Sequence, residues 1–192
     1  MALTGILLCG GKSLRMGTDK ALLELKQLPM VTYPLRILQK WCTEIIISAN
    51  DSRLDFLGYP IIPDEIKNIG PMGGLHACLM KSTNSRNIIL ACDMPLITGE
   101  LLQKMLSVPS KYDAVVPMIN QRPEPLYAIY QKSILPKIEQ AIDGKTYSLQ
   151  KLLSQLNVFY MDMNVQQTNE LFNANTLAEI TTYERLSGNL IS

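Results

Sequence analysis

A glycine-rich loop early in the chain has the residue types that bind phosphate groups. The apolar residues 3–8 lead through Cys9 directly into Gly10 and Gly11. Three basic residues follow in the same loop: Lys12, Arg15 and Lys20. Glycines let backbone N–H groups approach an anion closely, while Arg offers a fork and Lys a mobile charge to phosphate oxygens. The loop matches neither a P-loop nor G-x-G-x-x-G, so it predicts phosphate binding of another kind.

Polar residues also follow three other short apolar runs, at Asn50, Asp64 and Asp93. A carboxylate such as that of Asp93 is a preferred ligand of Mg²⁺, with phosphates and waters completing the shell. Asp93 could instead cap the turn after it. Asp-x-Pro after an apolar strand suits both roles, and we favour the metal role.

Short apolar segments alternate with amphipathic ones along the chain, which predicts the elements that must position these residues. The predicted strands are residues 3–8, 45–47, 59–62, 87–92, 114–118, 126–130 and 158–161. The predicted helices are residues 30–41, 73–81, 100–106, 133–142 and 176–186. Strands that are apolar on both sides and alternate with helices indicate an α/β three-layer sandwich, a mostly parallel sheet with helices on both faces. Ligands bind such sheets beyond the carboxyl ends of the strands, where the polar residues above would meet.

Size and charge exclude several classes of protein. The 192 residues suit one domain, predicted over residues 1–192, and the net charge is +1. A hydrophobic share of 47% excludes a disordered chain, and the charge balance argues against a nucleic-acid partner. No apolar run approaches the roughly 18 residues of a membrane span, so we expect no membrane partner. Four cysteines without C-x-x-C spacing argue against structural zinc and indicate a reducing, cytoplasmic location.

The motifs together resemble those of a known family. Gly-Gly-x-Ser-x-Arg-Met-Gly-x-Asp-Lys-Ala-Leu-Leu, from Gly10 to Leu23, looks like the signature of the molybdenum cofactor guanylyltransferases, which are MobA-like nucleotidyltransferases. Four shorter blocks resemble family motifs in the same order: Ile47-Ser48-Ala49-Asn50, Ile62-Pro63-Asp64 followed by Gly70-Pro71-Met72-Gly73-Gly74-Leu75, Cys92-Asp93-Met94-Pro95, and Phe172-Asn173-Ala174-Asn175-Thr176. Any one block is a weak signal, whereas their combination and order are specific.

The resemblance implies a Rossmann-like fold that transfers GMP from GTP to the terminal phosphate of molybdopterin and releases pyrophosphate. The implied GTP-binding residues are Leu8, Cys9, Gly10, Gly11, Lys20, Asn50, Asp64 and Asp93. Among these, Asp64 and Asn50 resemble the family's guanine and ribose contacts, and a carboxylate suits guanine because it can accept from two N–H donors of that base. The implied catalytic residues are Arg15, Lys20 and Asp93, with Asp93 holding Mg²⁺. Asn173 and Asn175 would contact molybdopterin, although turn formation explains two asparagines equally well. The N-terminal half would bind GTP and the C-terminal half would face molybdopterin, with transient contact to molybdopterin-insertion proteins.

Two other functions stay open at this point. One is a cytidylyltransferase, or a nucleotidyltransferase acting on a sugar or alcohol phosphate; Cys-Asp-Met-Pro and Gly-Thr-Asp-Lys favour guanylyl transfer over these. The other is a nucleotide-binding protein without turnover, which would be expected to lack the loop cations or Asp93. Thr146-Tyr147 departs from the paired arginines of some family members, which leaves the pterin side of the site open.

Overall fold

A computed structural model of the chain describes residues 2–10 and 20–163. Its strands are β1 (Thr4–Leu8), β2 (Glu24–Leu25), β3 (Leu28–Pro29), β4 (Glu44–Ser48), β5 (Ile61–Ile62), β6 (Arg86–Ala91), β7 (Ala114–Ile119), β8 (Arg122–Pro123), β9 (Tyr127–Gln131) and β10 (Val158–Asp162). Its α-helices are α1 (Thr32–Trp41), α2 (Pro71–Lys81), α3 (Gly99–Leu106), α4 (Leu135–Asp143) and α5 (Leu149–Leu153). Short 3₁₀ turns cover Lys20–Leu22, Ser52–Leu57 and Lys132–Ile134.

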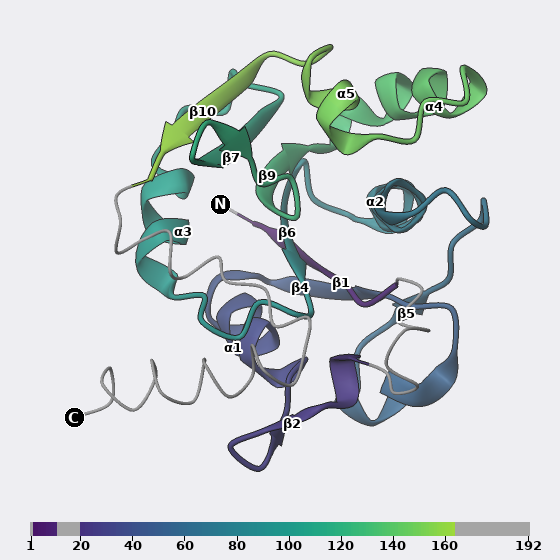
Figure 1. The fold of residues 1–192 in the computed structure, drawn as a ribbon, viewed down its shortest axis with the longest axis vertical. Coiled ribbons are helices and arrows are strands. Elements are labelled where there is room, and N and C mark those ends of the chain that lie inside the picture. Colours follow the sequence, from purple (N-terminus) through teal and green to yellow (C-terminus); the bar gives the residue numbers. More distant parts are fainter. Residues whose placement is uncertain (1, 11–19, 164–192) are drawn as a thin grey trace.

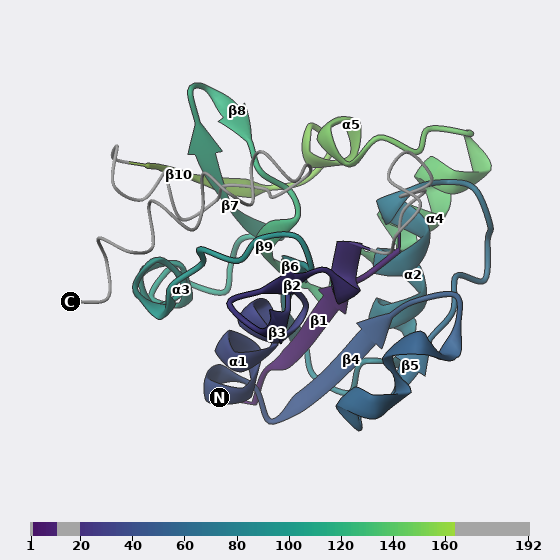
Figure 2. The ribbon, with the colours of Figure 1, turned by 60° about the horizontal axis from the view of Figure 1, so that its bottom comes forward.

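One large sheet runs through the middle of the molecule in the order β10-β7-β9-β6-β1-β4-β5, with β8 paired to β7 (Figure 1). The pairs β6–β1, β1–β4, β4–β5 and β7–β10 are parallel. Among the described strands of this sheet, only β9 and β8 run against their neighbours. The predicted mostly parallel sheet is therefore confirmed, and β5 and β10 form its two edges (Figure 2).

Helices cover both faces of this sheet, as the apolar runs predicted. Helices α1 and α3 lie on one face, whereas α2, α4 and α5 lie on the other (Figure 1). Successive residues of a strand point to opposite faces. In β1, for example, Leu7 packs in the first core and Ile6 and Leu8 in the second. The approach of α1 is so close that a Cβ at Gly5 would lie 2.9 Å from the Leu38 side chain.

The predicted elements agree with the structure in type, and most boundaries agree within two residues. Helix α2 begins at Pro71, two residues earlier than predicted, because proline suits a first helical turn. Two hairpins were missed: β2–β3, and the β7–β8 hairpin that turns the chain back before β9. The predicted helix at 176–186 lies outside the described residues. Among the described residues, no helix is long and apolar enough to span a membrane.

Candidate active site

Four neighbouring strands end side by side at the carboxyl-terminal side of the sheet. We call this side the sheet edge; it is distinct from the edge strands β5 and β10. Strands β5, β4, β1 and β6 are parallel neighbours, so their carboxyl ends lie side by side. Asp64, Asn50, Gly10 and Asp93 follow these strands in that spatial order. Strand β9 runs the opposite way, so its first residues lie at the same edge beside the end of β6. The topology thus gathers the predicted site residues that the structure describes.

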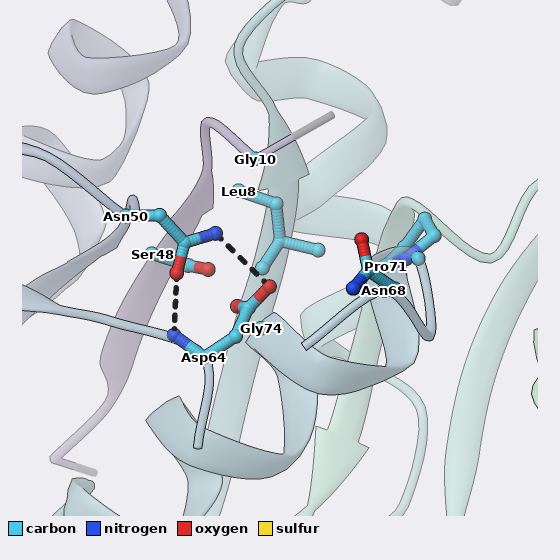
Figure 3. Close-up of a pocket in the computed structure, with 9 residues that line it drawn as sticks. Leu8, Gly10, Ser48, Asn50, Asp64, Asn68, Pro71 and Gly74 are labelled. Carbon is cyan, nitrogen blue, oxygen red and sulfur yellow. Dashed lines mark hydrogen bonds between the residues drawn. The ribbon is translucent and has the colours of Figure 1, made fainter. Parts of the chain in front are cut away.

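A cavity of about 520 Å³ opens among three of these strand ends (Figure 3). Its volume lies within the roughly 300–1,000 Å³ usual for small-molecule sites. Four of its lining residues were predicted as GTP contacts: Leu8, Gly10, Asn50 and Asp64. Five more complete the wall: Ser48, Asn68, Gly70, Pro71 and Gly74. The cavity therefore joins the ends of β1, β4 and β5 to the start of α2.

Asn50 and Asp64 hold each other by two hydrogen bonds across the mouth of the cavity (Figure 3). The backbone N–H of Asp64 donates to Oδ1 of Asn50 at 2.9 Å. The Nδ2 group of Asn50 donates to Oδ2 of Asp64 at 3.1 Å. The other carboxylate oxygen, Oδ1 of Asp64, is buried and has no hydrogen-bond partner within the described part of the chain. A carboxylate that lines a cavity suits a ligand that brings its own N–H donor.

Two glycines shape the wall formed by α2. Gly70 precedes the helix with φ of 67°, a conformation that side chains disfavour, and it turns the chain into Pro71. At Gly74 the helix lies so close to β4 that an added Cβ would be 2.2 Å from Oγ of Ser48. The start of α2 therefore lies directly at the cavity, where the positive end of the helix dipole favours a carboxylate or another anion.

Lys20 and Asp93 form a second feature of the same edge. Nζ of Lys20 lies 3.8 Å from Oδ2 of Asp93, and each side chain is about one-fifth exposed, at 23% and 22%. Lys20 opens the 3₁₀ turn at residues 20–22, and Asp93 follows β6 by two residues. Neither residue lines the cavity described above. The structure therefore groups Gly10, Asn50 and Asp64 around the cavity and leaves the Lys20–Asp93 pair apart from it along the sheet edge.

Glu124 is a neighbour of this pair that the sequence did not single out as a site residue. Burial raises the pKa of its carboxyl group above the ordinary value, and the charge of Asp93 raises that pKa further. A hydrogen bond from the backbone N–H of Leu126 to Oε1, at 3.4 Å, acts in the opposite direction. Its place between two prolines in the segment leading to β9 was the available signal.

The remaining predicted site residues divide into two groups. Cys9 has its backbone N–H bonded to the carbonyl of Ser48 at 2.9 Å and its side chain against the core, so that amide holds β1 to β4. Gly11 and Arg15 lie outside the described residues, as do Asn173 and Asn175. Asn68 was not foreseen, because a lone asparagine in a loop has no distinguishing neighbour in the sequence.

The donor set at the sheet edge fits Mg²⁺ better than a metal held by protein ligands alone. Within residues 2–10 and 20–163, no cluster of three or more His, Cys, Asp or Glu side chains could form a metal cage. Mg²⁺ normally takes one or two carboxylates, with waters and substrate phosphates at its other positions. Asp93 is a partly exposed carboxylate of this kind, next to the cation Lys20.

A three-layer α/β fold with these residues at its strand ends is that of a nucleotidyltransferase. The family comparison specifies the group within that class. The chain belongs to the MobA-like NTP transferase domain family, whose model matches residues 5–158. The matched segment runs from the second residue of β1 to the first residue of β10 and includes the cavity residues, Lys20 and Asp93.

Relatives that are about 30% identical to this chain span nearly all of it. A Flavobacterium johnsoniae protein named "Probable molybdenum cofactor guanylyltransferase" is 31% identical over 179 residues, which are 93% of this chain and 94% of that protein. A Vibrio vulnificus protein named "Molybdenum cofactor guanylyltransferase" is 29% identical over 185 residues, or 94% of each. The crystal structure of molybdopterin-guanine dinucleotide biosynthesis protein A from Archaeoglobus fulgidus shares the fold, with a TM-score of 0.79 at 24% identity over 97% of this chain and 99% of that one.

Proposed function

We propose that this protein transfers GMP from GTP to the terminal phosphate of molybdopterin and releases pyrophosphate. The observation that carries the proposal is the arrangement of the sheet edge, with an Asp64-lined cavity at one end and the Lys20–Asp93 pair at the other. The names of the relatives support the same reaction. In this reaction an oxygen of the molybdopterin phosphate attacks the α-phosphorus of GTP, and the bond from that phosphorus to the pyrophosphate oxygen breaks.

The cavity would take the guanine. Guanine carries adjacent N–H donors, and the carboxylate of Asp64 lines the cavity as an acceptor for them. Cytosine offers an acceptor at its ring nitrogen N3, so a carboxylate at this place would repel that edge. A group that reads a base by such hydrogen bonds discriminates strongly, because the wrong base leaves the buried acceptor unpaired.

The phosphates would extend along the sheet edge from the cavity towards Lys20 and Asp93. Asn50 and Asp93 follow β4 and β6, which lie on either side of β1. Adjacent strands are about 4.8 Å apart, so these two strand ends are roughly 10 Å apart. Gly10, at the end of β1, lies between them and lines the cavity. A nucleotide with its base at Asp64 would therefore bring its phosphates past Gly10.

Lys20 would hold phosphate oxygens, and Asp93 would hold Mg²⁺. When bound, Mg²⁺ neutralises phosphate charge and supports the leaving group. Fixed charges of this type contribute most of the catalysis in phosphoryl and nucleotidyl transfer, since the chemistry needs positioning and electrostatic stabilisation. Replacing Lys20 by Ala should lower kcat by about 100-fold or more, and a near-normal kcat would contradict this role.

Several further roles are part of the same proposal. Gly11 would contribute a backbone N–H to the phosphates, and Arg15 would stabilise the leaving pyrophosphate. Asn173 and Asn175 would contact molybdopterin from the C-terminal half of a single domain over residues 1–192. Transient contact with a molybdopterin-insertion protein would protect the labile product. The described cysteines carry thiols, which supports a reducing, cytoplasmic setting.

Nucleotide selection is the experiment that separates this function from its rivals. The purified protein is titrated with GTP, CTP, ATP and UTP in the presence of Mg²⁺, and binding is measured by calorimetry. We expect GTP to bind at least 100-fold more tightly than CTP, because loss of hydrogen bonds to a charged acceptor costs about 1.5–3 kcal/mol each. Tighter binding of CTP would point to a cytidylyltransferase and would overturn the proposal.

A further inference from the structure

The amide of Asn50 makes two hydrogen bonds within the protein, both to Asp64. Its oxygen accepts from the backbone N–H of Asp64, and its nitrogen donates to the carboxylate of the same residue. The two bonds have opposite polarity, so only one orientation of the amide satisfies both of them. Turning the amide over would place N–H against N–H and an oxygen against the carboxylate (Figure 3). An asparagine is therefore matched to this position in shape and in polarity.

The residue that Asn50 holds stands on a weakly attached segment. Strand β5 is only two residues long and, among the strands that the structure describes, pairs with β4 alone at the side of the sheet. Beyond it, residues 63–68 are exposed apart from Asp64, which is only partly so. The bond from the Asp64 N–H to Asn50 continues the connection between β4 and this segment past the last strand residue. It thereby fixes the loop that also brings Asn68 and Gly70 to the cavity.

We propose that Asn50 is a positioning residue for nucleotide selection, acting on the base through the carboxylate of Asp64. The alternative is a direct contact of Asn50 with the ribose or the phosphates. The inference rests on the proposed function in one respect, since it takes the base to be guanine. In this arrangement the side chain of Asn50 fixes the direction of the Asp64 carboxylate, and Asp64 alone meets the N–H donors of the base.

A double-mutant cycle on nucleotide affinity tests this division of roles. The variants are Asn50→Ala, Asp64→Ala and their combination, each titrated with GTP and Mg²⁺ in calorimetry. We expect each single change to weaken GTP binding by about 10- to 100-fold, the value of a hydrogen bond to a charged group. Because Asn50 acts through Asp64, the double variant should bind no more weakly than Asp64→Ala. Losses that multiply would show that Asn50 has its own contact with GTP and would overturn the proposal.

Two nucleotide analogues give a readout that general damage to the fold would not imitate. ITP lacks the 2-amino group of guanine, and dGTP lacks the ribose 2′-hydroxyl. In the Asn50→Ala variant the preference for GTP over ITP should fall towards one, while the preference for GTP over dGTP should stay at the wild-type value. The reverse pattern would assign Asn50 to the ribose. Asn50→Asp keeps the acceptor for the Asp64 N–H but sets two carboxylates together, so it should bind GTP more weakly than Asn50→Ala.

A measurement without nucleotide keeps this test independent of the proposed function. Amide hydrogen exchange at residues 63–70 should become faster in Asn50→Ala, and unchanged rates there would overturn the positioning role for any ligand. The matched control is Asp51→Asn, which weakens the ion pair with the exposed Arg53, 2.6 Å away, but keeps the side-chain oxygen that accepts from the Arg53 N–H. This control should leave the exchange rates and GTP affinity unchanged. Failure of wild-type protein to select GTP would instead count against the proposed function.

Discussion

Replacing Gly74 by Ala tests how closely α2 must approach β4 to form the wall of the cavity. An added Cβ would lie 2.2 Å from Oγ of Ser48, 3.2 Å from its Cβ and 3.3 Å from Cδ2 of Leu8. Ser48 is only 1% exposed, so it has little room to move away.

The expected magnitude follows from two opposing effects. Overpacking a core by one methyl group costs about 1–3 kcal/mol. Replacing glycine by alanine inside a helix returns about 1 kcal/mol. We therefore expect Gly74→Ala to lower the free energy of unfolding by about 1 kcal/mol, within a range of about 0–2 kcal/mol. For a chain of this size a loss of 1 kcal/mol lowers Tm by roughly 2–4 °C.

The decisive assay is urea unfolding of Gly74→Ala in two backgrounds. In the Ser48→Ala background the contact at 2.2 Å no longer exists, so the helix effect should prevail and Gly74→Ala should be neutral or stabilising. The cycle should therefore give a coupling energy of about 1–2 kcal/mol between the two positions. An equal loss of stability in both backgrounds, or a stabilising effect in the wild-type background, would refute the close approach of α2 to β4.

Two further predictions concern ionised groups that tie elements together away from the cavity. Arg86→Met should lower the free energy of unfolding by about 2–4 kcal/mol, because the buried guanidinium donates at 3.0–3.2 Å to three carbonyls at the end of α3; a loss below 1 kcal/mol in urea unfolding would contradict this. The backbone N–H of Asn157 and, after it, Lys137 hold the pKa of Asp113 below its usual value. The carboxylate therefore stabilises the folded state above about pH 4, and this stabilisation is lost as pH falls through the folded pKa. Asp113→Ala should therefore cost about 1–3 kcal/mol at pH 7 and much less at acidic pH, and a pH-independent cost would contradict the assignment.

The hydrophobic pattern was sufficient to predict the sheet and its covering helices, because strands buried on both faces must be apolar throughout. The missed hairpins show where this signal ends. The β2–β3 turn places Lys26 and Gln27 at φ of 46° and 65°, and the β7–β8 turn places Asn120 and Gln121 at 47° and 62°. Such turns normally carry glycine, so three of these four residues gave no turn signal. Tertiary packing determined the conformation there.

The candidate site was predictable wherever a residue directly follows a strand. Asn50, Asp64 and Asp93 meet at one edge because β4, β5 and β6 point the same way. The sequence could not predict which side chains contact each other, since no local pattern shows that the Asn50 amide hydrogen-bonds Asp64. The nearness of Glu124 to Asp93 was also not foreseen. It depends on β9 running antiparallel to β6, which the sequence did not predict.

The most direct test of the account is guanylylation of molybdopterin by the purified protein. The assay contains GTP, Mg²⁺ and molybdopterin, and it follows pyrophosphate release together with formation of the dinucleotide. We predict one pyrophosphate for each dinucleotide formed, with both products reduced by about 100-fold or more in Asp93→Asn, which removes the charge that would hold the metal. GTP that stays unchanged beside molybdopterin, or full activity in Asp93→Asn, would contradict the account.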